Sequence, residues 1–401
     1  MKKICLSVVG LYIFMFAGFG QKASSDTTYK SRKLTFEEAN LVSSYYKQDG
    51  NNSAVTGGIG TEKLTDIANV IDVKLHRWDK KDRKQSLDVE IGIDHYTSAS
   101  SDRIDLKNNS SASHADTRLY PSVNWSRENE QKGSTIGIGV SLSSEFDYRS
   151  IGVNASYSQK TKNRNGEFTA KAQAYLDQVS LILPTELRPP GQGNGNDDEN
   201  NYPKTSRNSF SGSFSYTQII NQRLQLGLLL DVIYQQGYLS LPFHRVYFAN
   251  GSVHQENLPD TRMKIPVALR ANYFIGDKII LRSYYRYYHD DWGVNAHTFN
   301  LEVPVKITPF LSISPFYRYY NQTAAKYFAP YQTHTAAEQF YTSNYDVSKF
   351  SSNFYGAGFR VAPPKGVFGM QHLNMLELRY GRYTRTTGLN SNIISLNLKF
   401  K

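Results

Sequence analysis

The chain has 401 residues, of which 39% are hydrophobic, 13% aromatic and 20% charged, with a formal net charge of +11. Its mean hydropathy of -0.51 is too low for a bundle of membrane helices, and its aromatic content is too high for a disordered chain. The basic residues are scattered along the sequence, which argues against nucleic acid as a partner. The single cysteine, Cys5, excludes an internal disulfide framework and a thiolate metal site.

Residues 1–20, MKKICLSVVGLYIFMFAGFG, combine two lysines with an apolar run that ends in small residues. This pattern is typical of a cleaved export signal, so we exclude it from the fold. We expect residues 21–37 to form an N-terminal periplasmic segment and residues 38–401 to form the folded domain. No later run of about 18 apolar residues predicts a membrane helix, but an exported chain can cross the outer membrane as a closed β-barrel.

The rest of the chain is rich in segments where apolar and polar residues alternate, as in transmembrane strands. About sixteen such segments occur in chain order, at 38–48, 67–78, 85–97, 117–127, 134–145, 149–160, 166–178, 207–220, 223–237, 262–275, 278–290, 294–307, 310–321, 353–363, 372–385 and 391–400. The segment 38–48 has the weakest pattern, and without it the barrel would have fourteen strands. The last segment alternates cleanly to the end of the chain, as expected of a strand that closes a barrel by pairing with the first.

The connections between these segments support an up-and-down barrel. Every second one is short, at 79–84, 129–133, 161–166, 221–223, 276–277 and 308–309, whereas long excursions fall between them at 49–66, 98–116, 179–206, 238–261 and 322–352. An outer-membrane barrel has short periplasmic turns and long external loops, so the sequence predicts this all-β fold class. Aromatic residues enrich the loops 238–261 and 322–352. We expect these loops to cover the mouth, to enter the bore, to bind a partner or, equally favoured, to pack only on one another.

The alternation also assigns residues to the lipid or the lumen face. Ile394, Leu396, Leu398 and Phe400 are predicted to face lipid. The charged residues predicted to face the lumen are Asp72, Asp88, Glu90 and Asp94 on early segments and Arg270, Arg282, Arg286, Arg318 and Arg379 on later ones. Opposite charges on different wall sectors would produce a field across the bore that biases ion selectivity. The alternative is that these charges pair and neutralise one another.

Two oxygen-rich loops suggest a calcium site, because Ca²⁺ prefers carboxylate and carbonyl ligands. The candidates are Asp49, Asp66, Asp102, Asp105 and Asp116, although ordinary turn formation explains the same residues and no EF-hand spacing occurs. No other cofactor is expected. The motif HDDW, with His289, Asp290 and Asp291, would suit a hydrolase at the rim, but neighbours in a strand point to opposite faces.

Several phrases, including DGNNSAVTGGIGTEKLTD, SSASHADTRLYPSVNW and LPDTRMKIPVALRANYFIGDKIILRSYYRYYHDDWGVNAHTFNLEVP, resemble a family of exported bacterial proteins catalogued as a domain of unknown function. The resemblance spans nearly the whole mature chain. It implies an outer-membrane barrel with no assigned activity or catalytic residues. It also implies a gene neighbourhood with a flavin transferase, and so a partner in envelope redox or electron transfer. The chain itself has no flavinylation motif.

The sequence therefore predicts a non-enzymatic outer-membrane barrel that acts as a porin-like channel or as part of an envelope complex. The alternatives are a docking barrel for a partner and, less favoured, a rim hydrolase. The expected partners are outer-membrane lipid and, during insertion, the barrel-assembly machinery.

Overall fold

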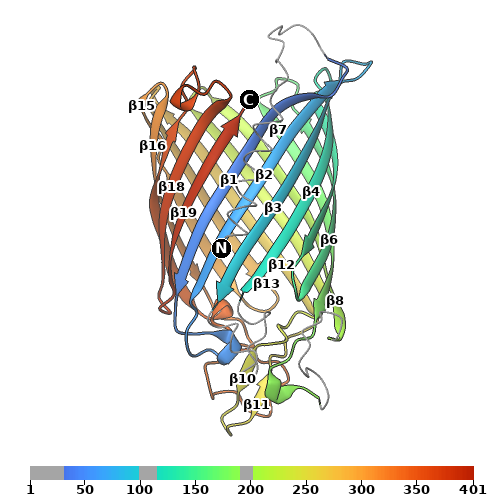
Figure 1. Ribbon diagram of the computed structural model, residues 1–401, viewed down its shortest axis with the longest axis vertical. Helices are drawn as coiled ribbons and strands as arrows, with labels where there is room; N and C mark the ends of the chain where they lie inside the picture. Colours follow the sequence, from blue (N-terminus) through green and yellow to red (C-terminus); the bar gives the residue numbers. More distant parts are fainter. Residues whose placement is uncertain (1–30, 99–114, 190–201) are drawn as a thin grey trace.

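A computed structural model of the chain describes residues 31–98, 115–189 and 202–401. The expected export signal, residues 1–20, lies outside the described residues, as do residues 21–30 of the expected periplasmic segment. The described chain forms one closed antiparallel barrel (Figure 1). Within the described ranges, no helix is long and apolar enough to cross a membrane.

The strands follow one another around the wall in chain order. The first nine are β1 (Thr35–Asp49), β2 (Leu64–Trp78), β3 (Lys84–Ser98), β4 (Ala115–Asn129), β5 (Ser134–Ser144), β6 (Tyr148–Lys160), β7 (Gly166–Ser180), β8 (Lys204–Asn221) and β9 (Leu224–Gly237). The others in the wall are β12 (Thr261–Ile275), β13 (Ile279–Asp290), β14 (Asn295–Glu302), β15 (Val305–Thr308), β16 (Leu311–Gln322), β17 (Phe350–Val361), β18 (Leu373–Arg385) and β19 (Asn390–Phe400). The short strands β10 (Arg245–Tyr247) and β11 (Val253–Gln255) form a separate hairpin.

The wall closes because β1 pairs with β2 on one side and with β19 on the other. The sheet has seventeen strands, but β14 and β15 share one position, since both pair with β13 and with β16. The wall therefore has sixteen positions, as predicted. The weak segment 38–48 is part of β1, so the fourteen-strand alternative is wrong.

One predicted strand is not continuous. The segment 294–307 was expected to be a single strand, but it is interrupted at Val303 and Pro304. Pro304 has no N–H to donate to the ladder, and the strand resumes after it at Val305. The wall stays joined there, because Ile280 donates its N–H to the carbonyl of Pro304 at 3.0 Å.

The connections are sorted between the two ends as predicted. One end carries the turns 79–83, 130–133, 161–165, 222–223, 276–278, 309–310 and 362–372, and the other end carries the long loops 50–63, 181–203, 238–260 and 323–349. Three short connections, 145–147, 291–294 and 386–389, share the end with the long loops. In Figure 1 the long loops gather at the lower end, with β10 and β11 among them.

The outward face of the wall is apolar, as a lipid-facing surface requires. Ile138 on β5 is 59% exposed and Leu228 on β9 is 50% exposed, and Val140 and Leu226 on the same two strands are exposed as well. On β19, Ile394 is 45% exposed, whereas Leu398 and Phe400, which lie on the same face of the strand, are buried. They form a cluster with Ala39, Leu41, Val367 and Leu373, because the turn 362–372 brings Val367 against the end of the wall.

Candidate functional site: the charged lumen

An acidic wall lines the lumen along β2 and β3. Asp72 on β2 pairs in register with Glu90 on β3, so two carboxylates lie side by side. Asp88 stands one lumen position from Glu90 on the same strand. Among the described residues, no lysine or arginine forms an ion pair with any of these three. Lys74 lies opposite Asp88 in the ladder, so the unpaired negative charge of this wall is centred on Asp72 and Glu90.

Asp94 is the exception on the acidic wall. Arg118 on β4 donates to its Oδ2 from Nη2 at 2.6 Å, and the Tyr120 hydroxyl donates to its Oδ1 at 2.8 Å. Asp94 is 7% exposed, so these bonds hold a buried carboxylate. For this residue the alternative interpretation, that lumen charges neutralise one another, describes the structure.

A basic wall lines the lumen along β12, β13 and β16. Arg270, Arg282, Arg286 and Arg318 border one cavity of about 660 Å³. The same cavity is bordered by polar side chains of Asn272, Tyr284, Thr298, Asn300 and Glu302. Four guanidinium groups and one carboxylate thus surround a single space.

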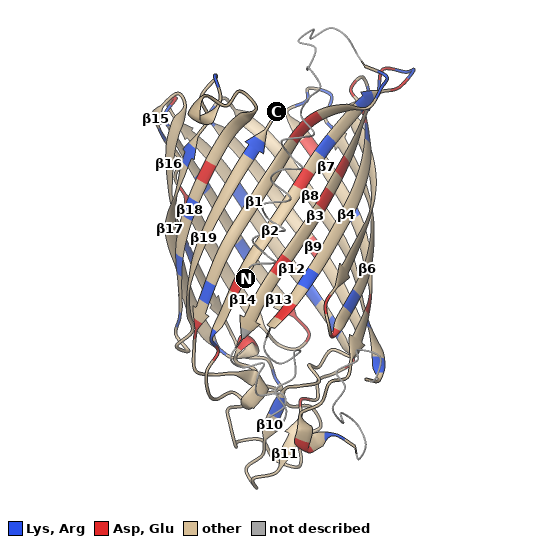
Figure 2. Ribbon diagram, viewed as in Figure 1, with Lys and Arg blue, Asp and Glu red and all other residues tan. Residues whose placement is uncertain are grey.

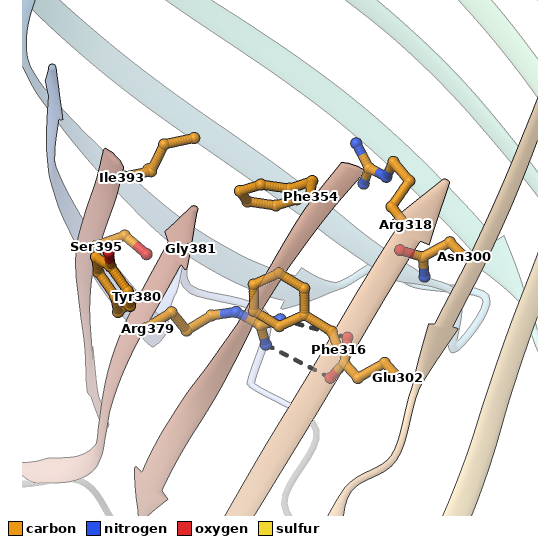
Figure 3. A pocket seen from close by; sticks show the side chains of 10 residues that line it. All are labelled: Asn300, Glu302, Phe316, Arg318, Phe354, Arg379, Tyr380, Gly381, Ile393 and Ser395. Carbon is orange, nitrogen blue, oxygen red and sulfur yellow. Dashed lines mark hydrogen bonds and ion pairs between the residues drawn. The ribbon is translucent and has the colours of Figure 1, made fainter. Parts of the chain in front are cut away.

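Glu302 on β14 is already shared by two arginines. Arg379 on β18 donates to its two oxygens from Nη1 and Nη2, each at 3.4 Å, as Figure 3 shows. Arg282 also donates to Glu302 at 3.4 Å, and Glu377 accepts a further bond from Arg379 at 3.0 Å. These four side chains form a network with two positive and two negative charges.

Three arginines remain outside that network. In the part of the chain that the structure describes, Arg270, Arg286 and Arg318 form no ion pair with a carboxylate. The Nε of Arg286 is buried without a hydrogen-bond partner, and its Nη2 forms only a long hydrogen bond, of 3.5 Å, to Thr298 Oγ1. Arg318 stacks over the Phe354 ring at 5.7 Å and points away from Glu302 (Figure 3). The basic wall therefore carries an unneutralised positive charge.

The two walls stand opposite each other. In the ring of sixteen positions, β12 is eight positions from β2 in either direction, and β13 is eight positions from β3. Figure 1 shows β2 and β3 in the near wall with β12 and β13 behind them, and Figure 2 shows acidic residues on the near strands. The unpaired carboxylates and the unpaired guanidinium groups thus face each other across the bore, with a field perpendicular to its axis.

The long loops pack into a cap at their end of the barrel. Arg245 on β10 is 2% exposed and joins three of these loops. Its Nη1 donates to the carbonyl of Val55 at 2.8 Å, and its Nε and Nη2 bind the two oxygens of Glu186. A buried guanidinium with a bidentate carboxylate fixes both the position and the orientation of its neighbours.

A second buried network holds the centre of the cap. Glu256 is 4% exposed and accepts a bond from the backbone N–H of Leu241 at 2.7 Å and another from the Thr342 hydroxyl. His244 Nδ1 lies 3.4 Å from Glu256 Oε1. Burial opposes ionisation of this carboxyl, but His244 and the two donors outweigh it and hold the Glu256 pKa below its ordinary value. The described contacts of loops 238–261 and 322–352 are with one another and with other loops, as expected of loop-on-loop packing.

Among the described calcium candidates, Asp116 is the one that lies in a cluster of carboxylates, and neither Asp49 nor Asp66 belongs to that cluster. Asp102 and Asp105 lie outside the described residues, and Asp49 ends β1. Asp116 instead meets Glu145 and Asp147, with one oxygen of each within 4.8 Å of the others. The Tyr96 hydroxyl donates to Glu145 at 2.9 Å and to Asp116 at 3.3 Å.

Glu145 and Asp147 escaped prediction because the connection 145–147 is too short to look like a binding loop. Burial raises the pKa of both carboxyls. Protonation and the Tyr96 hydroxyl are thus available to relieve the repulsion between these side chains without an ion.

The HDDW motif does not form a catalytic constellation. His289 is exposed on the outward face and lies 2.8 Å from Asn295 Oδ1. Asp290 is 1% exposed on the other face, where it accepts bonds from Arg262 and from the Tyr288 hydroxyl. The histidine and this carboxylate are on opposite sides of the wall, as adjacent strand residues must be.

The chain is distantly similar to several proteins of known structure. The chain is similar to a BenF-like porin from Pseudomonas fluorescens Pf-5, at 9% identity and a TM-score of 0.44 over 93% of this chain and 100% of that one. It is similar to Pseudomonas aeruginosa OccK1 (OpdK), at 8% identity and a TM-score of 0.42 over 93% and 99%. It also resembles the P. aeruginosa ferric enterobactin receptor PfeA, at 12% identity and a TM-score of 0.46 over 88% and 54%. Likenesses this distant concern the fold alone.

A search of curated proteins found no match. A family model described as a protein of unknown function, DUF3570, matches residues 107–386, which is more than half of the chain. This match agrees with the resemblance read from the sequence. The chain therefore belongs to the DUF3570 family of proteins of unknown function, and its described residues form a closed β-barrel.

Proposed function

We propose that the barrel is a water-filled channel for small charged solutes and that it catalyses no reaction. The observation that carries this proposal is the pair of unneutralised walls, acidic on β2–β3 and basic on β12, β13 and β16, on opposite sides of one lumen. A wall of about sixteen strands is wide enough to leave an aqueous bore. Rings and rows of charge in such a bore select ions.

The arrangement of the charges supports a role beyond stability. Asp72 and Glu90 are cross-strand neighbours, and like charges in that position destabilise a sheet. A barrel selected only for stability would neutralise them, as Arg118 neutralises Asp94. Retained like-charge pairs are a feature of functional sites.

The test is single-channel recording of the folded protein in a planar bilayer, with reversal potentials under a salt gradient. We expect a stable ohmic step. The double variant Asp72→Asn/Glu90→Gln should shift the reversal potential toward anion selectivity, because it removes two negative charges from the lumen. A barrel that is folded, as judged by its heat-modifiable gel mobility, yet gives neither conductance nor solute flux would contradict the proposal.

The packed cap favours a second candidate, a barrel that docks a partner in the cell envelope. Its loops are held by the ion pair of buried Arg245 with Glu186 and by the fully buried contact of His244 with Glu256. A partner in envelope redox chemistry would fit this candidate. Co-purification from crosslinked outer membranes separates the two proposals, since a free-standing channel should be recovered alone and a docking barrel with a stoichiometric partner.

A further inference from the structure

We propose that the basic wall is a binding site for a small solute that carries two or more anionic oxygen groups, such as a dicarboxylate or a diphosphate. The site is the cavity between β12, β13 and β16, and Arg270, Arg286 and Arg318 are its ligand-binding residues. The inference deepens the proposed function and rests on it, because the solute reaches the site through the bore.

The first argument is the balance of charge around the cavity. Glu302 is the one carboxylate among its lining residues, and it already accepts bonds from Arg282 and Arg379. Glu377 completes that network from the other side of Arg379. Arg270, Arg286 and Arg318 therefore have no carboxylate of the described chain to share. Three positive charges are left for a ligand or for counterions.

The second argument is the bonding capacity of these groups. A guanidinium group binds a carboxylate or phosphate through two parallel hydrogen bonds. Arg270 and Arg318 are exposed to the lumen, while Arg286 has a buried Nε without a partner. A single anionic group cannot form paired hydrogen bonds with three guanidinium groups that come from three different strands. A solute with several anionic groups therefore fits the site better.

The third argument is the rest of the lining. Asn272, Thr298 and Asn300 add amide and hydroxyl groups beside the arginines, and these can donate to oxyanions or to hydroxyls on a solute. The cavity of about 660 Å³ is within the range of small-molecule sites, which is roughly 300–1,000 Å³. The acidic wall across the bore repels the same solute and directs it to the arginines.

The experiment measures binding separately from transport. Isothermal titration of the full folded barrel in detergent uses succinate and inorganic pyrophosphate as probes, with succinamide as the uncharged match for succinate. We expect saturable binding of at least one anionic probe and none of succinamide. The triple variant Arg270→Gln/Arg286→Gln/Arg318→Gln should weaken that binding by about tenfold or more, since each lost bond to a charged group weakens affinity.

The matched control is Lys80→Gln/Lys162→Gln/Arg223→Gln, which removes the same formal charge from exposed short turns that do not line the cavity. It should bind the probes like the unaltered protein, and an equal loss in both triple variants would overturn the site. Channels that conduct normally but bind neither anionic probe would also overturn the site and leave the proposed function standing. Saturable binding of an anionic probe by a barrel that conducts no current would support the site and overturn the proposed channel function.

Discussion

Asp72 and Glu90 lie directly opposite each other on the β2–β3 ladder, both on the lumen face and with no ion pair to a described cation. The Asn40 amide donates to Asp72 Oδ1 at 3.1 Å, which holds the side chain in place without neutralising it. The repulsion between the two carboxylates is therefore built into the folded wall, and relieving it should be measurable.

Asp72→Asn should make the barrel more stable, because it removes one of two like charges while keeping a side chain of the same shape. The expected gain in the free energy of unfolding is about 0.2–1 kcal/mol, the usual size of a cross-strand pair term. Urea unfolding in lipid vesicles measures it. Asp94→Asn is the matched control, and it should destabilise the barrel, because Asp94 is bound by Arg118 and Tyr120. Loss of stability in both variants would contradict this account.

Gly92→Ala should destabilise the barrel by about 1–3 kcal/mol, the usual range for overpacking. The Tyr120 ring lies so close over Gly92 that a methyl group there would clash with it. The ring must then move, and its hydroxyl would lose the bond to Asp94. Gly212→Ala is the control, because its new methyl group would meet the nearest atom at 3.6 Å, an ordinary contact. Equal midpoints of urea unfolding for the two variants would refute the prediction.

Arg245→Ala should loosen the cap and leave the barrel folded. The substitution removes the link between the loops that carry Val55, Glu186 and β10, and it leaves a carboxylate without its partner. We expect faster chymotrypsin cleavage within the loops and larger, noisier single-channel currents, with unchanged heat-modifiable mobility. Lys349→Ala, at an exposed position in the cap, should behave like the unaltered protein. Unchanged cleavage in Arg245→Ala would show that the cap does not depend on this residue.

The cap should also weaken in acid. The pKa of Glu256 is lowered in the folded cap from an ordinary value of 4.5, so its contribution to stability is complete above that pH. The contribution is lost as the pH falls through the lowered pKa, because the open state binds the proton more tightly. Hydrogen exchange of peptides from β10 and β11, corrected for the intrinsic rate, should therefore rise below about pH 4.5.

Glu256→Gln provides the control for this pH effect. The variant should exchange faster than the unaltered protein at pH 7 and should show a smaller further rise in acid, because the titrating group is gone. Acid should affect Glu62 in the opposite way to Glu256. Burial raises the pKa of Glu62, so its protonation stabilises the folded cap. An acid response of the same size in Glu256→Gln would assign the effect to other groups.

The strands were predictable because lipid on one side and water on the other impose an alternation with a period of two. Even β1 follows it, where Ala39 and Leu41 face outward beside Asn40. The same rule assigned the lumen charges to their strands. It could not reveal the break at Pro304, because the alternation continues through the residues on both sides of the proline.

Neither the packing of the cap nor the pairing of charges could be predicted, because neither follows from a regular alternation of residue types along the sequence. Arg245 and Glu186 are 59 residues apart and meet only when their loops pack. The short strands β10 and β11, of three residues each, carry too few positions for an alternating pattern to stand out. No sequence pattern indicates that Arg118 neutralises Asp94 while Asp72 stays unpaired. That difference depends on which side chains are close enough to bond across the ladder.

The seam between β1 and β19 also has a consequence for how the barrel is made. The amide of Asn390 donates to the carbonyl of Asp49 across 341 residues, and the whole of β19 pairs with β1 in the same way. Contacts so distant along the chain form late, because a large loss of conformational entropy must precede them. Until the eleven residues of β19 are in place, the growing sheet has two open edges. Completion of the ring is thus the final, all-or-none step of assembly, and a chain that stops before Asn390 should remain unfinished however well its other strands have paired.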